Sequence, residues 1–162
     1  MVKKGNETGI KVKATNRKAL RDYEIEEKLE AGIVLVGSEI KSIREGRASL
    51  REAYADVDGG EVWLHDMNIS PYVQAAHFGH EPTRARKLLL HKDEIKRLTG
   101  RITERGYTLV PVRLYIKDGK AKVELGLARG KRQYDKRREI ARKDADREIE
   151  RAVRHRGRGG SR

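Results

Sequence analysis

The sequence lacks cysteine altogether and has only three prolines, one tryptophan and one phenylalanine among its 162 residues. The absence of cysteine excludes disulfides, thiol nucleophiles and thiolate-bound zinc, and it suits a reducing cytoplasm. No apolar run approaches the roughly 18 residues that a membrane-spanning helix requires. The basic N-terminus also lacks the apolar segment of a signal peptide. We therefore expect a cytoplasmic protein with no membrane partner.

Charge is what the sequence has in excess, because 39% of its residues are charged and the formal net charge is +13. Residues 1–21 carry +6 and residues 129–162 carry +8, which leaves −1 for residues 22–128. A nearly neutral middle between two basic ends is typical of a protein that binds a polyanion such as RNA. A structural ribosomal protein or a general RNA-binding protein would have the same composition, so these alternatives stay open.

The middle of the chain consists mainly of strand patterns separated by turn residues. Residues 23–29 alternate and predict a half-buried strand, and after the interruption at Gly32 residues 33–36 predict a more fully buried strand or a bent extension of the first. Residues 53–66 predict a hairpin around Asp58-Gly59-Gly60, and residues 107–128 predict a second hairpin around Asp118-Gly119. The rhythm of strand, helix and parallel strand is missing, so the sequence predicts a small antiparallel barrel of about six strands.

Three short helices are expected between these strands. Asn16 is the predicted N-cap of the first helix, and Ser38 is the predicted N-cap of the second, which Gly46 ends. The third helix covers residues 91–105. Residues 73–86 have no periodicity and predict a long loop, and such loops are often functional in compact domains.

The two ends of the chain are expected to be extensions of the barrel. Residues 1–15 are polar and predict a flexible basic arm. Residues 131–162 permit a helix, but their apolar residues make only one thin stripe, so that helix is marginal alone in water. We expect this tail to be disordered in the free protein and to fold on a partner, the alternative being a solvated helix packed loosely on the barrel. The stripe consists of Ile140, Ala145, Ile149 and Val153.

Neither catalysis nor a metal site is expected. His77 and His80, with His65 and His91, suggest a metal site only weakly, because the helical H-E-x-x-H spacing is absent. The sequence also lacks a glycine-rich phosphate loop, a nucleophile elbow and a paired-carboxylate motif. We therefore predict a binding protein without enzyme activity, metal or cofactor.

Three segments together resemble the small protein B family, the bacterial tmRNA-binding proteins of trans-translation. They are EAGIVL with GSEIKSIREG (residues 30–46), PTRARKLLLH (residues 82–91) and LARGKRQYDKR (residues 127–137). The resemblance implies a mainly β, oligonucleotide-binding (OB)-type barrel over residues 16–130 with three short helices. It further implies a monomer that binds the tRNA-like domain of tmRNA and carries it to stalled ribosomes for ribosome rescue. There the tail would become helical in the decoding region and empty mRNA channel, beside small-subunit ribosomal RNA.

The resemblance also assigns residues to each partner. Matching positions imply tmRNA binding for Asn16, Arg17, Lys18, Glu30, Leu89 and Lys122. In the tail, matching positions imply tagging roles for Gly130 and for Asp135, Lys136 and Arg137, and we add Lys131, Arg132 and Tyr134 as contacts in the decoding region. Tyr134 stands where some family members have histidine, so stacking on a base is retained but a titratable imidazole is not.

The residues around the long loop add to this surface. Arg84, Arg86 and Lys87 suit contacts with RNA phosphates, although each is equally explained as an ordinary surface cation. Since three successive leucines cannot all face inward on one strand, we expect Leu88 and Leu90 to be buried. Leu89 would then be an apolar contact for RNA, the alternative being core packing.

Overall fold

The computed structural model describes residues 9–72, 79–131 and 133–158. The chain forms two compact units, Met1–Arg129 and Gly130–Arg162. The first unit contains β1 (Ile10–Thr15), α1 (Arg17–Asp22), β2 (Tyr23–Ile33), α2 (Gly37–Arg44), β3 (Ala48–Ser49), β4 (Tyr54–Asp58), β5 (Glu61–His65), β6 (Asn68–Ile69), β7 (Arg86–Leu89), α3 (Lys92–Arg105), β8 (Thr108–Lys117) and β9 (Lys120–Gly130). The second unit contains α4 (Gln133–Arg158).

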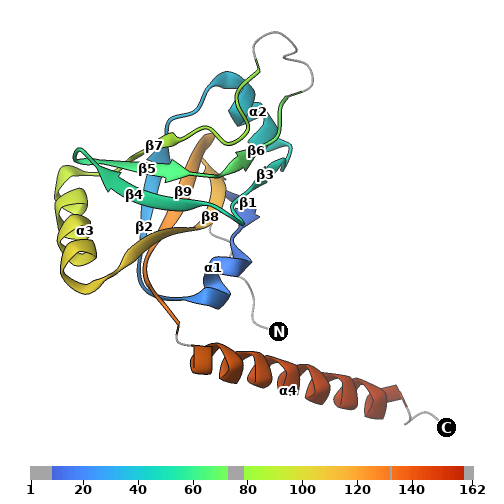
Figure 1. Ribbon diagram of the computed structural model, residues 1–162. Coiled ribbons are helices and arrows are strands. Elements are labelled where there is room, and N and C mark those ends of the chain that lie inside the picture. Colours follow the sequence, from blue (N-terminus) through green and yellow to red (C-terminus); the bar gives the residue numbers. More distant parts are fainter. Residues whose placement is uncertain (1–8, 73–78, 132, 159–162) are drawn as a thin grey trace. The chain divides into compact units, whose positions relative to one another are not determined.

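The first unit is an antiparallel barrel. Its strands follow the order β8-β4-β5-β7-β2-β9, and the pairing of β9 with β8 closes the ring (Figure 1). This arrangement confirms the predicted mainly β fold of about six strands with three short helices. Both predicted hairpins are present, and Gly59 and Gly60 take the positive φ angles of 58° and 75° that the tight β4–β5 turn requires.

The core of the barrel is built by alternation along the long strands. On β9, Val123, Leu125 and Leu127 are fully buried, and burying each such side chain contributes about 1.5–3 kcal/mol. Gly126 lies where β9 passes close to its neighbours, because a Cβ there would stand 3.0 Å from Ile25 and 3.2 Å from Val112. At this position β9 therefore packs closely against β2 and β8.

Two predictions about local structure are wrong. Residues 10–15 are not part of a flexible arm but form β1, which pairs with β8 from Ile10↔Lys117 to Thr15↔Arg113. β4 pairs with β8 at Leu109, so β1 uses the hydrogen-bonding groups along the other half of that edge. Residues 1–8 lie outside the described part. In α2 the N-cap position is Val36 rather than Ser38, and the Glu39 side chain accepts a hydrogen bond from Val36 N at 3.0 Å.

The second unit is one helix of 26 residues, as the helix-permissive composition indicates. Its predicted apolar stripe is wrong, however. At about 100° per residue, Ala145, Ile149 and Val153 share one side, whereas Ile140 lies nine residues before Ile149 and therefore on the opposite side. Ile149 and Val153 are 61% and 64% exposed, so within this unit the helix buries little. No helix in the described ranges is long and apolar enough to cross a membrane.

Candidate nucleic-acid interface

Three residues from distant parts of the sequence are carried by three neighbouring strands, β7, β2 and β9. Leu89 pairs in register with Gly32, and Glu30 lies two residues before Gly32 on the same outward side of β2. Lys122 lies on β9 and its charge acts on the Glu30 carboxylate. Leu89 is 51% exposed while Leu88 is buried, as predicted, whereas Leu90, also predicted to be buried, is only partly buried. The structure thus places Glu30, Leu89 and Lys122, three of the six residues that the resemblance assigned to RNA binding, on three neighbouring strands.

Gly32 holds the exposed leucine of this patch close to the sheet. A Cβ at Gly32 would stand 3.2 Å from Leu89 Cβ, which is tighter than ordinary packing. The Leu89 side chain therefore lies across the backbone of β2 at Gly32. The result is an apolar surface on the same outward side of β2 as the Glu30 carboxylate.

Glu30 is an oriented hydrogen-bond acceptor. The Tyr115 hydroxyl donates to its Oε2, and Lys117 Nζ lies 3.4 Å from the same oxygen. The hydrogen bond from Tyr115 lowers the pKa of Glu30, burial opposes this, and the charges of Lys117 and Lys122 lower that pKa further. Burial and the neighbouring carboxylate raise the pKa of Tyr115. Among the described residues no donor contacts Glu30 Oε1, so this oxygen faces no competitor there for an amino or imino group of a base.

The Asn16-Arg17-Lys18 motif occupies the start of α1. Asn16 is 2% exposed, and its Oδ1 accepts from Ala19 N at 3.0 Å while its Nδ2 donates to Pro111 O at 3.0 Å. The predicted N-cap is therefore confirmed, but a direct contact between the Asn16 side chain and RNA is not compatible with this burial. Asn16 instead fixes the helix that carries the exposed Arg17 and the partly exposed Lys18.

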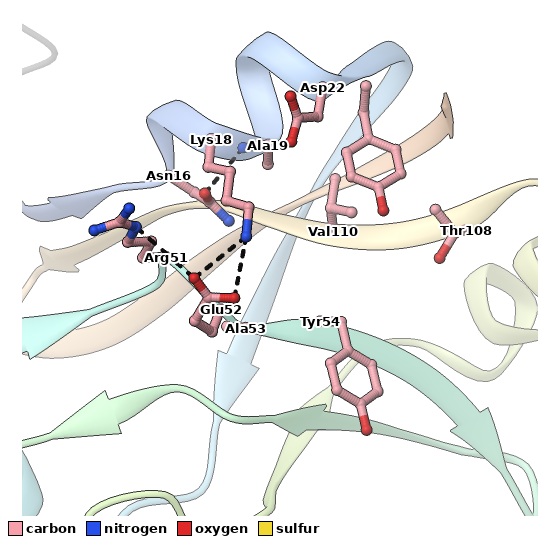
Figure 2. Close-up of a pocket in the computed structure, with 11 residues that line it drawn as sticks. Asn16, Lys18, Ala19, Asp22, Arg51, Glu52, Ala53, Tyr54, Thr108 and Val110 are labelled. Carbon is pink, nitrogen blue, oxygen red and sulfur yellow. Dashed lines mark hydrogen bonds and ion pairs between the residues drawn. The ribbon is translucent and has the colours of Figure 1, made fainter. Parts of the chain in front are cut away.

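A pocket of about 400 Å³ opens beside this motif (Figure 2). Lys18 Nζ contacts both carboxylate oxygens of Glu52, at 3.2 and 3.1 Å. Tyr54 is 47% exposed, and its ring stacks on His65 with the centroids 5.0 Å apart. The pocket is lined by Asn16, Lys18, Ala19, Asp22, Tyr23, Arg51, Glu52, Ala53, Tyr54, Thr108 and Val110. Its size falls within the range of small-molecule sites, and its wall combines two tyrosine rings with two cations and two carboxylates.

The three cations predicted around the long loop have different environments. Arg86 is fully buried and forms an ion pair with the equally buried Glu39. It also donates to Met67 O at 2.7 Å and Pro82 O at 3.1 Å. The prediction that Arg86 contacts phosphate is therefore wrong, because this buried guanidinium already binds Glu39 and two backbone carbonyls. Arg84 also pairs with Glu39 but keeps 35% of its side chain exposed, and Lys87 pairs with Glu61 at 2.8 Å.

The buried pair of Glu39 and Arg86 keeps both of its groups charged. Burial acts to raise the pKa of Glu39, but the hydrogen bonds from Val36 N, Arg84 and Arg86 outweigh it, so this pKa lies below its ordinary value. Burial lowers the pKa of Arg86 from a starting value so high that the group stays charged. The sequence did not reveal this network, because Glu39 and Arg86 are 47 residues apart.

The residues predicted to contact the decoding region begin at the last residue of β9. Gly130 is the last residue of β9, and residues 134–137 lie in the first turns of α4. Arg137 is exposed, and Arg132 lies outside the described residues.

Of the histidines weighed as metal ligands, His80 hydrogen bonds to Ser38 Oγ at 2.8 Å and donates to Ile69 O at 2.9 Å. His77 lies outside the described residues.

This chain is similar to known proteins over most of its length. The family model "SmpB protein" matches residues 13–155. Two similar proteins, both called SsrA-binding protein, come from Desulfitobacterium hafniense and Geobacillus thermodenitrificans. The first is 56% identical over 93% of this chain and 97% of its own length, and the second is 60% identical over 90% and 94%. A solved structure described as "tmRNA-SmpB: a journey to the center of the bacterial ribosome" aligns with a TM-score of 0.63 and 42% identity, over 82% of this chain and 95% of that chain. The chain belongs to the SmpB protein family.

Proposed function

We propose that this protein binds the tRNA-like domain of tmRNA through its barrel and delivers that RNA to stalled ribosomes for trans-translation. It acts in the cytoplasm as a binding factor and catalyses no reaction. The observation that carries the proposal is the arrangement of Glu30, Leu89 and Lys122 on the neighbouring strands β2, β7 and β9. Relatives named SsrA-binding protein, at 56–60% identity, support the choice of RNA.

The three side chains offer complementary contacts to a folded RNA. Lys122 and Lys117 supply charge for phosphates, and such contacts make binding depend on salt. Leu89 supplies an apolar surface, and Glu30 supplies an acceptor that reads base edges rather than backbone. Sequence-specific recognition of RNA usually relies on unpaired bases, for which this mixture is suited.

The pocket beside α1 extends the same function. An unpaired base entering it would stack on aromatic surface, and Lys18 and Arg51 would meet the flanking phosphates. In the second unit, α4 supplies the basic segment that enters the decoding region and the empty mRNA channel, where small-subunit ribosomal RNA is its partner. The barrel and the tail therefore bind two different RNAs.

The direct test is to purify the full-length protein from its own cells and sequence the RNA bound to it. We expect one small structured RNA, tmRNA, and we expect the protein to leave ribosomes that are washed with high salt. A structural ribosomal protein would instead remain on salt-washed ribosomes, and a general RNA-binding protein would retain a mixture of RNAs.

Charge reversal at the proposed surface gives a second test with a matched control. Lys122→Glu should weaken binding of the tRNA-like domain by roughly tenfold, which corresponds to about 1.4 kcal/mol. Lys96→Glu makes the same charge change at an exposed position of α3 and should leave the affinity within about twofold. Equal losses in the two variants would show that only net charge matters.

A further inference from the structure

Four side chains converge where β9 ends. On β2, the two carboxylate oxygens of Glu26 accept three hydrogen bonds. Arg129 Nη2 lies 2.8 Å from Oε1, and the Tyr107 hydroxyl and Arg101 Nη2 lie 2.7 and 3.1 Å from Oε2. We call Glu26, Arg101, Tyr107 and Arg129 the Glu26 clasp. Its members come from β2, α3, the segment before β8, and β9.

The Tyr107 ring is the second point on which the cluster converges. Only 5% of Tyr107 is exposed, and the guanidinium carbons of Arg101 and Arg129 lie 4.9 and 5.2 Å from its ring centroid. Both distances are within the range of cation–π attraction. Glu26 offsets the repulsion between the two guanidinium groups, and its pKa is lowered by the Tyr107 hydroxyl first and by Arg129 and Arg101 next. The clasp is therefore a balanced set of charges around one buried ring.

The position of Arg129 gives the clasp its significance. Thr108↔Ala128 is the final pairing between β8 and β9, so Arg129 is the first residue beyond that ladder. Arg129 is also the last residue of the first compact unit, and Gly130 begins the second. An arginine with half of its side chain exposed would ordinarily be mobile, yet Arg129 is held by an ion pair with Glu26 and by the ring of Tyr107.

We propose that the Glu26 clasp fixes the point from which the C-terminal segment leaves the barrel. Glu26 and Tyr107 act as positioning residues, and neither contacts RNA in this role. Without the clasp, the end of β9 would fray and lengthen the linker between the barrel and α4. Because effective concentration falls as a flexible linker lengthens, the tail would reach its ribosomal site less often.

The neighbouring residue Glu27 provides a matched control. Glu27 also joins β2 to α3, through an ion pair with Arg97, but it does not hold Arg129. Its side chain is 32% exposed, compared with 29% for Glu26. Glu26→Gln and Glu27→Gln therefore each remove one carboxylate between β2 and α3, and only the first releases the start of the tail.

The test measures the mobility of a label next to the clasp. The chain has no cysteine, so Lys131→Cys provides one unique site for a spin label in the full-length free protein. We expect Glu26→Gln and Arg129→Gln to increase the mobility of the label, and Tyr107→Phe, which keeps the ring, to have a smaller effect. Glu27→Gln should leave the label as it is. Unchanged mobility in Glu26→Gln, or an equal increase in Glu27→Gln, would overturn the proposal.

A functional readout rests on the proposed function and separates this role from general stability. At limiting protein, Glu26→Gln should lower peptide tagging by roughly two- to fivefold, as expected for one partly exposed ion-pair site. The affinity for tmRNA should stay within about twofold, because the clasp lies outside the proposed binding surface. A larger loss of tmRNA affinity than of tagging would contradict the proposal. The label experiment uses no RNA, so it decides the role of the clasp even if the unmodified protein fails to tag.

Discussion

Glu39 holds the base of the long loop and the start of α2 together from inside the barrel. Its carboxylate accepts from Val36 N and pairs with Arg84 and Arg86, and both Glu39 and Arg86 are fully buried. Removing one partner from a buried ion pair leaves the other charge without compensation, which is far costlier than losing a surface pair. Glu39 is therefore the residue on which the stability of this part of the molecule depends most.

The first prediction concerns Glu39→Gln. This change should lower the free energy of unfolding by about 3–5 kcal/mol, because it leaves the Arg86 guanidinium buried without its counter-charge. Glu61→Gln removes the partner of Lys87 at a half-exposed pair and should cost less than about 1 kcal/mol. Urea unfolding of both variants measures the difference, and similar losses would contradict the buried network.

The same network gives stability a defined pH dependence. The pKa of Glu39 in the folded protein lies below its ordinary value of 4.5. Its contribution is therefore fully present above that value and is lost as the pH falls through the lower, folded pKa. Unfolding between pH 7 and pH 3 should show this loss in the unmodified protein, and a smaller slope in Glu39→Gln.

The second prediction concerns Tyr54 in the pocket beside α1. If a base stacks there, Tyr54→Ala should weaken binding of the tRNA-like domain by about 1–3 kcal/mol. Tyr54→Phe keeps the aromatic face and should bind nearly as well as the unmodified protein. Titration of labelled RNA distinguishes the variants, and equal affinity in all three proteins would remove the pocket from the RNA-binding surface.

For single residues, the sequence predicted burial and capping correctly where alternation or residue type alone determines them. Period-2 alternation predicted that Leu88 is buried and Leu89 exposed, and the N-cap at Asn16 followed from residue type. The same alternation puts Arg86 on the buried side with Leu88, but charge argued against burial. Its partner Glu39 lies on a different element, so no local pattern indicated the pair.

At the level of elements, turns were predicted well and edges poorly. Asp58-Gly59-Gly60 and Asp118-Gly119 are residue types that tolerate the positive φ angles of tight turns, and both hairpins are present. In β1 three of the six residues are apolar, and Ile10, Val12 and Ala14 alternate with polar residues. This alternation is a local strand signal that the prediction of a flexible arm overlooked, and half of one edge of β8 is available to pair with the strand.

The third prediction is that α4 orders on the ribosome. In the free protein we expect hydrogen exchange to show the backbone amides of residues 134–158 unprotected, because the apolar side of the helix is thin and exposed. Those amides should become protected when the protein and tmRNA bind stalled ribosomes. Strong protection in the absence of RNA would instead favour a helix that is stable by itself.

The fourth prediction concerns the two sides of α4. Lys143, Arg147, Arg151 and Arg154 follow one another at spacings of four, four and three residues, so they share one side of the helix. Arg138 and Arg142 each lie nine residues before Arg147 and Arg151, which puts them on the opposite side. We expect the four-cation side to contact ribosomal RNA.

Charge reversal separates these two sides at equal net charge. Arg147→Glu with Arg151→Glu should lower peptide tagging by roughly tenfold, whereas Arg138→Glu with Arg142→Glu should have a smaller effect. Tagging on stalled ribosomes in vitro is the measurement. If the two double variants lose the same activity, the tail is recognised by its total charge and not by one face.

On the scale of the whole molecule, charge and fold divide the protein at different residues. Residues 22–128 carry −1, but the barrel unit Met1–Arg129 also contains the basic residues 1–21 and Arg129 and carries +6, while Gly130–Arg162 carries the other +7. The composition did predict the basic C-terminal segment, since segregated charge is visible without any structure. The surface itself was not visible, because Glu30, Leu89 and Lys122 become neighbours only when β2, β7 and β9 pair.

The fifth prediction tests this division of labour, which is the central claim. The protein lacking residues 131–162 should bind the tRNA-like domain with an affinity within about twofold of the full-length protein at roughly 150 mM salt, where nonspecific phosphate contacts are weakened. The same truncation should abolish peptide tagging on stalled ribosomes. Intact RNA binding with no tagging is the result we expect, and a loss of RNA affinity comparable to the loss of tagging would contradict it.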